Sequence, residues 1–197
     1  MNAEQYNAVI DILKKQEYQN CGAHDVEHAI RVYNLAKLII SKQEAKVNET
    51  VVLLAALLHD LADHKFGYST EQQTEIISNT LINLNYSQDV VSGVTYIAAT
   101  ISFSGKKIPT TLEGQIVQDA DRLDAIGAVG IGRVFSYNGK IGKKMSGPDS
   151  AIQHFYDKLF KLKDLMNTDT AKQIAVERNQ YMIEFVKRFD MEEKGEI

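Results

Sequence analysis

The chain has 197 residues, a formal net charge of −4 and a single cysteine. This weak negative charge argues against a nucleic-acid-binding protein, which needs a basic face, and one cysteine excludes an internal disulfide. No stretch approaches the ~20 apolar residues that span a bilayer, and the first residues show no basic, apolar leader, so we expect a cytoplasmic protein without membrane contact.

The composition predicts an all-α fold. The chain contains only two prolines, and helix-favouring residues dominate, whereas the alternation typical of strands is hard to find. A length of 197 residues suits one well-packed domain better than two. Helices are expected at about residues 3–16, 25–43, 48–64, 70–84, 88–103, 112–126, 149–165 and 168–190.

The second expected helix begins with two histidines. Asp25 is a suitable N-cap, with His24 just before it and His28 in the first turn, and Arg31 follows one turn later. A lone histidine at a helix start is as often a local hydrogen bonder as a metal ligand. This segment alone leaves both interpretations open.

The most informative stretch is the third expected helix, which Asn48 caps and which runs to about His64. Its residues 51–58 are all apolar, so the helix should be buried on every side. The apolar run leads directly into His59 and Asp60. An ionised aspartate is costly to bury beside a histidine unless both have strong partners, and a metal ion satisfies an imidazole and a carboxylate together. The pair therefore predicts a metal site.

Three aspartates mark the helix expected at about 112–126. Asp121 and Asp124 lie one turn apart and share a face, whereas Asp119 points elsewhere. These residues either form a solvated acidic face that Arg122 neutralises, or one of them supplies a further ligand to the metal site.

The last third of the chain adds little chemistry by itself. The glycines between 127 and 132 do not match a dinucleotide-binding fingerprint, since no strand precedes them, and they predict close helix packing instead. The segment 138–148 is expected to be a flexible basic loop, whose Lys143 and Lys144 could close over an anionic substrate. His154 has no acidic cluster around it and is interpreted as an ordinary histidine.

Three ordered motifs resemble the HD superfamily of metal-dependent phosphohydrolases. They are GAHDVEH at 22–28, LLHDLADHKF at 57–66 and QDADRLDAIGAVGIGR at 118–133. The match is closer to a bacterial subgroup, which HFYDKLFKLKDLMNT at 154–168 also resembles, with one departure, an additional alanine directly before His24. The resemblance covers most of the chain.

The resemblance implies an HD-domain helical bundle that forms one domain over 1–197. Its core helices would occupy about 25–126, and C-terminal helices at about 149–190 would pack on them. It also implies one divalent metal ion, with manganese first and iron, cobalt, nickel, zinc or magnesium as alternatives. The implied ligands are His28, His59, Asp60 and Asp121, and the motif favours Asp121 over Asp124.

Further roles follow from the same resemblance and from charge. Asp63 is placed near the attacking water, and His64 is a candidate for protonating the leaving oxygen. Surface ion pairing is the alternative for every outer candidate except Asp63 and Lys65. The candidates for contacting the substrate and its phosphates are Lys65, Arg31, His24, Arg122, Asp124, Lys143 and Lys144.

The implied reaction is hydrolysis of a (deoxy)nucleoside triphosphate to the monophosphate and pyrophosphate. The expected partner is a small-molecule nucleotide, with no nucleic acid and no membrane, and a homodimer is left open. One alternative is a phosphatase acting on nucleoside 5′-monophosphates or another small phosphoester. A second is a non-catalytic sensor of nucleotide or metal. A di-iron oxygenase is least favoured, since it needs a second metal and only His24 and His64 are spare.

Overall fold

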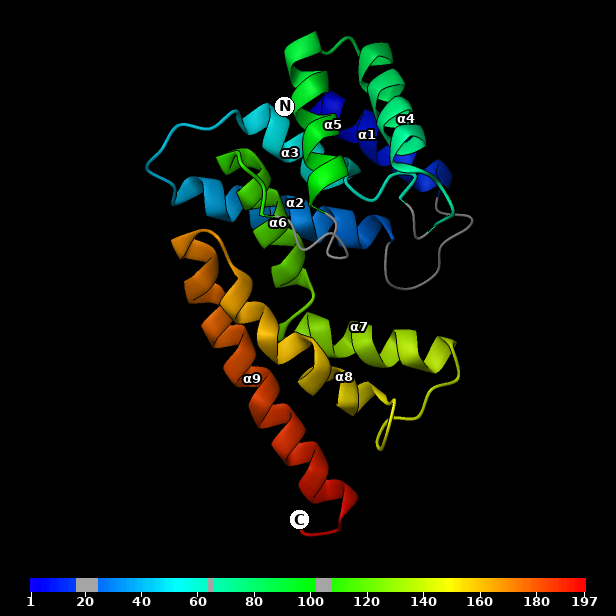
Figure 1. Ribbon diagram of the computed structural model, residues 1–197, viewed down its shortest axis with the longest axis vertical. Helices are drawn as coiled ribbons and strands as arrows, with labels where there is room; N and C mark the ends of the chain where they lie inside the picture. Colours follow the sequence, from blue (N-terminus) through cyan, green and yellow to red (C-terminus); the bar gives the residue numbers. More distant parts are fainter. Residues whose placement is uncertain (17–24, 64–65, 102–107) are drawn as a thin grey trace. The chain divides into compact units, whose positions relative to one another are not determined.

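The computed structural model describes residues 1–16, 25–63, 66–101 and 108–197 (Figure 1). Within these ranges the regular secondary structure is entirely helical, so the all-α prediction is confirmed. None of the helices described is long and apolar enough to cross a membrane.

The chain divides into two compact units, residues 1–121 and 122–197. The division falls inside helix α6, Leu112–Asp124, which continues unbroken across it. A single domain over 1–197 stays a prediction.

Helix α3 is the centre of the first unit. All residues from Val51 to Leu58 are buried, as the apolar run predicted. Helix α3 packs against α2 and α5, α4 packs against α5, and α1 contacts both α2 and α3. The helices of this unit before α6 are α1 (Ala3–Gln16), α2 (Val26–Ser41), α3 (Glu49–Leu58), α4 (Thr70–Asn83) and α5 (Gln88–Thr100).

Side-chain caps define where these helices begin. Asp25 accepts a hydrogen bond from the backbone N–H of His28, and Asn48 accepts one from Val51, as the sequence predicted. Helix α2 ends at Ser41, two residues earlier than expected. Leu38, in the last turn of this helix, is 43% exposed.

The largest difference between a predicted and an observed helix end is at the end of α3. The helix was expected to run to about His64 but ends at Leu58, with His59 as its C-cap. Two tight turns follow, in which Leu61 N–H donates to the Leu58 carbonyl and Asp63 N–H donates to the Asp60 carbonyl. The helix therefore stops before the His-Asp pair rather than carrying it.

The second unit contains three α-helices and one 3₁₀ helix besides the last residues of α6: α7 (Gly127–Lys140), α8 (Ala151–Asp157), η4 (Leu159–Leu165) and α9 (Asp169–Glu193). Helix α9 packs against α7 and η4, and α8 packs against the same two elements. Rings of Phe135, Phe155 and Phe185 lie 5.9–6.4 Å apart and join α7, α8 and α9.

Two expectations for this unit need correction. Residues 138–140 belong to α7, so the basic loop begins only at Ile141. The helix expected at 149–165 is broken at Lys158, where α8 ends and the 3₁₀ segment follows.

The predicted close helix packing is confirmed for Gly127, which lies against α9, whereas Gly130 lies against the turn that precedes α7 and Gly132 has no close neighbour. Gly127 has a φ of +79°, which favours glycine, and a methyl group there would lie 3.0 Å from the side chain of Arg178. A methyl group at Gly130 would lie 2.3 Å from the carbonyl oxygen of Ala125, whereas Gly132 has open space around it.

Candidate metal centre

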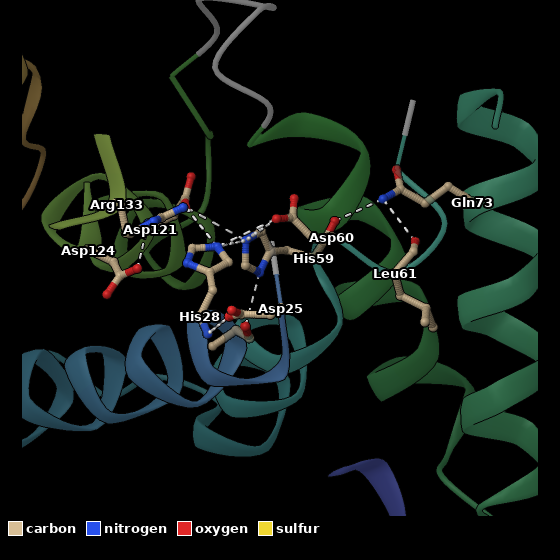
Figure 2. A network of polar contacts seen from close by, with 10 residues as sticks. Asp25, His28, His59, Asp60, Leu61, Gln73, Asp121, Asp124 and Arg133 are labelled. Carbon is tan, nitrogen blue, oxygen red and sulfur yellow. Dashed lines mark hydrogen bonds and ion pairs between the residues drawn. The ribbon is translucent and has the colours of Figure 1, made fainter. Parts of the chain in front are cut away.

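Side chains from three separate segments of the first unit meet around one point (Figure 2). His28 comes from the first turn of α2, His59 and Asp60 follow the end of α3, and Asp121 comes from α6. The Nε2 atom of His28 lies 3.3 Å from Nε2 of His59, 3.5 Å from Oδ2 of Asp60 and 3.4 Å from Oδ1 of Asp121. The Nε2 atom of His59 lies 3.6 Å from the same oxygen of Asp60 and 3.8 Å from that of Asp121.

These distances fit donor atoms that share one cation. With metal–ligand bonds of about 2.1 Å, two ligands lie roughly 3.0 Å apart at a right angle and roughly 3.4 Å apart at a tetrahedral angle. The observed separations of 3.3–3.8 Å begin between these two values and extend slightly beyond the tetrahedral one. One ligand atom from each of His28, His59 and Asp121 lies within 4.8 Å of the other two, which is close enough for the three to hold one ion. The Oδ2 atom of Asp60 lies beside both histidines.

The backbone around His59 orients its ring toward this cluster. The Nδ1 atom lies 3.0 Å from the carbonyl oxygen of Ala56, which can only accept a hydrogen bond, so Nδ1 carries the proton. In the neutral imidazole the lone pair is then on Nε2, the atom that faces the cluster. A carbonyl that fixes the tautomer in this way is usual behind a metal-bound histidine.

Burial and charge distinguish the two kinds of donor. The side chains of His28 and His59 are almost fully buried, whereas those of Asp60 and Asp121 are 16% and 30% exposed. Desolvation alone would raise the pKa of Asp121, but the hydrogen bond and the charge of His59, together with the charge of His28, hold that pKa well below its usual range. The cluster therefore combines two imidazole nitrogens with a carboxylate that stays ionised.

The structure describes only part of the predicted machinery near the cluster. Asp63 is 5% exposed, and its carbonyl accepts a hydrogen bond from Phe66 N–H. Arg31 is half-buried in α2, one turn after His28. His24, His64 and Lys65 lie outside the described residues. The roles assigned to all five stay predictions.

The remaining predicted contacts belong to the second unit. Arg122 is largely buried and donates to the carbonyl of Leu165. Asp124 is also buried and accepts a hydrogen bond of 2.5 Å from Arg133 (Figure 2). The solvated acidic face is therefore wrong for Asp124, and it is equally wrong for Asp119, which is fully buried.

The two lysines of the basic loop are exposed. Lys143 pairs with Asp149 across the loop, and the backbone carbonyl of Lys144 accepts a hydrogen bond from Ala151 N–H. Substrate contacts by Arg122, Asp124, Lys143 and Lys144 stay predictions.

Sequence reasoning missed two supports of the cluster. Ala56 lies three residues before His59, and helical spacing could have identified its carbonyl as the acceptor for the ring. Gln73, in α4, donates from Nε2 to the carbonyl oxygens of His59 at 2.8 Å and Leu61 at 3.2 Å. No local signal marks this glutamine, because its partners lie 12 and 14 residues away in the chain.

Comparisons with known proteins agree with this geometry. The family model described as the HD domain matches residues 25–126. The Bacillus subtilis protein YpgQ is 40% identical over an alignment of 177 positions, which covers 87% of this chain and 85% of YpgQ. The crystal structure of YpgQ in complex with ADP superposes with a TM-score of 0.78 and 35% identity, covering 93% of this chain and 97% of that one. A crystal structure of an HD-superfamily hydrolase from Bacillus thuringiensis gives a TM-score of 0.80 and 37% identity over 97% of both chains.

Proposed function

We propose that this chain, which belongs to the HD-domain family, is a metal-dependent phosphohydrolase that cleaves (deoxy)nucleoside triphosphates to the monophosphate and pyrophosphate. The resemblance seen in the three motifs is thereby confirmed at the level of the family, and a solved relative is an HD-superfamily hydrolase. The observation that carries the proposal is the convergence of two imidazole nitrogens and two carboxylate oxygens from three segments.

The residues proposed to hold one divalent cation are His28, His59, Asp60 and Asp121. Two nitrogen and two oxygen donors suit manganese, iron, cobalt, nickel or zinc better than magnesium, which prefers oxygen alone. When bound, such a cation supplies Lewis acidity, which lowers the pKa of a water and stabilises negative charge on phosphate oxygens. We take manganese as the first choice.

The chain itself would supply the proton transfers and the charge that holds the substrate. We assign the buried carboxylate of Asp63 to orienting the attacking water and accepting its proton. His64 is proposed to protonate the leaving oxygen, and Lys65 to neutralise phosphate charge. The proposed further substrate contacts are Arg31, His24, Arg122, Asp124, Lys143 and Lys144.

A nucleotide substrate is supported by the relative YpgQ, which has been crystallised in complex with ADP. Adenosine diphosphate combines a base, a sugar and a phosphate chain, the three parts that a nucleoside triphosphate pyrophosphohydrolase must recognise. The choice of the triphosphate, the native metal, a homodimer and a cytoplasmic location stay predictions.

The deciding experiment is a screen of nucleoside mono-, di- and triphosphates with the full chain and Mn²⁺, with identification of every product. The proposal expects pyrophosphate and a nucleoside monophosphate from triphosphates. If orthophosphate is the only product and comes only from monophosphates, the proposed pyrophosphohydrolase activity is wrong and the protein is a 5′-nucleotidase. A protein that binds Mn²⁺ and nucleotide but turns over none of them would be a sensor.

A further inference from the structure

A side chain from a neighbouring helix supports the backbone that carries two of the proposed ligands. Gln73 is 5% exposed in α4, and its Nε2 donates to the carbonyl oxygens of His59 and Leu61 at 2.8 and 3.2 Å (Figure 2). A glutamine amide nitrogen has two N–H groups, so this pair of hydrogen bonds uses both. One side chain thus holds the peptides on either side of the Asp60–Leu61 dipeptide.

The sequence of residues 58–63 does not by itself explain the turn that Gln73 supports. Helix α3 stops at Leu58 without a glycine or proline, and the carbonyls at a helix end have no partner within the helix. The chain then passes through Ala62 at a φ of +53°, a left-handed conformation that non-glycine residues rarely adopt. Such a conformation persists where surrounding contacts impose it. Gln73 supplies two of those contacts.

We propose that Gln73 is a positioning residue for the metal centre. By fixing the peptide groups that flank Asp60 and Leu61, it fixes the directions in which the side chains of His59 and Asp60 project toward His28 and Asp121. This inference rests on the proposed function, because it requires the cluster to bind a cation. It assigns to α4 a role in a site to which that helix contributes no ligand.

The variant that tests the proposal is Gln73→Met, which keeps the length of the side chain and removes both donors. Its matched control is Ile77→Val, one turn further along α4, which removes one buried methyl group and leaves the carbonyls of the turn with their partner. For the full chain, we would measure the Mn²⁺ dissociation constant by calorimetry and the visible spectrum of bound Co²⁺. The spectrum reports ligand geometry directly, which a general loss of stability does not change.

Gln73→Met is expected to weaken Mn²⁺ binding about tenfold and to shift the Co²⁺ bands, because supports behind metal ligands are typically worth that much. Ile77→Val is expected to lower the thermal midpoint while leaving both metal readouts unchanged. In the metal-free protein, amide hydrogen exchange over residues 58–63 should be faster in Gln73→Met than in Ile77→Val.

Three outcomes would count against the proposal. If Gln73→Met keeps the parental Mn²⁺ affinity and Co²⁺ spectrum, the positioning role is rejected and the proposed function stands. If the unsubstituted protein binds neither cation, the metal centre is rejected and the role of Gln73 with it. Should Gln73→Met not fold, Gln73→Asn takes its place, since it retracts the donors by one methylene, and a parental Co²⁺ spectrum in that variant would also overturn the role.

Discussion

The Nε2 atoms of His28 and His59 lie 3.3 Å apart in the interior of the first unit. The two rings meet nearly edge to face, at an angle of 69°. The Nδ1 proton of His59 is held by the carbonyl of Ala56. If both rings were neutral, the lone pair on Nε2 of His59 would therefore point at Nε2 of His28. Two buried imidazole nitrogens in this arrangement can share a proton or a cation, and the adjacent carboxylates of Asp60 and Asp121 offer the further oxygen donors that a cation would take.

Asp121→Asn should weaken Mn²⁺ binding by at least about tenfold, or about 1.4 kcal/mol of binding free energy. The amide retains an oxygen donor but loses the charge that the neighbouring histidines stabilise. Calorimetry on the full chain would measure the change. Asp89→Asn is the control, because Asp89 is an exposed aspartate in the first turn of α5. Equal affinity in the two variants would remove Asp121 from the ligand set.

Asp63→Asn separates an enzyme from a sensor. If Asp63 takes the proton of the attacking water, this variant should lose turnover by roughly 10²- to 10⁴-fold, the range for a lost general base. Its Mn²⁺ dissociation constant should stay within about twofold of the parental value, since Asp63 is not a proposed ligand. Steady-state kinetics and calorimetry on the same preparation would check both. Unchanged turnover would leave Asp63 with a purely structural role.

Removing the metal should lower stability reversibly. A cation present at a hundred times its dissociation constant stabilises the folded chain by about 2.7 kcal/mol if the unfolded chain does not bind it. For a protein of this length we therefore expect Mn²⁺ to raise the thermal midpoint by several degrees and EDTA to reverse the rise. Magnesium should have a smaller effect because two of the four donors are nitrogens. His28→Gln should abolish the response to Mn²⁺, and a response that persists in that variant would place the cation elsewhere.

The paired substitutions Gly130→Ala and Gly132→Ala should have opposite effects, although both lie inside α7. A methyl group at Gly130 would lie 2.3 Å from the carbonyl oxygen of Ala125, so the backbone must move, at a cost of about 1–3 kcal/mol. At Gly132 nothing lies within 4 Å, and alanine should stabilise the helix by about 0.5–1 kcal/mol. Urea unfolding of both variants would measure this, and equal effects would contradict the close contact at Gly130.

His154 should make the stability of the protein depend on pH. Burial, followed by the charge of Lys158, lowers the pKa of this imidazole, and Lys143 adds to the effect while Asp157 opposes it. Because the folded pKa lies below the unfolded value of about 6.5, the unfolded chain binds more protons between the two pKa values, and stability falls as the pH drops through that window.

Substituting His154→Gln should therefore reduce the loss of stability between pH 7 and the lower end of this window. Thermal unfolding of both proteins at several pH values would check this. At pH 8, where the imidazole is neutral in both states, the titration should contribute nothing. A difference between the two proteins that is constant over the whole pH range would show that His154 acts through packing alone.

The sequence predicted most helix starts because a local rule governs them. Asp25, Asn48 and Thr168 each accept a hydrogen bond from the backbone N–H three residues later, as N-cap side chains do. The motifs predicted which segments would meet in the cluster. The burial of Val51 to Leu58 was also predicted correctly. An uninterrupted apolar run is itself a local signal that this part of a helix is buried.

The features that the sequence did not reveal depend on contacts between distant segments. Nothing around Leu58 marks the end of α3, and an alanine at position 62 gives no sign of a left-handed backbone. Gln73 looks like any helical glutamine until its two acceptors are seen. Asp124 was open to interpretation as a solvated residue because only the fold supplies Arg133 as its buried partner.

The burial of every residue from Val51 to Leu58 in α3 limits how this protein can diversify. A charged or bulky replacement anywhere from Val51 to Leu58 would have to be accommodated without water, so these positions tolerate only exchanges among apolar side chains of similar volume. Descendants with a new substrate or metal preference must therefore acquire it through changes in the segments around α3, while that helix is inherited nearly intact.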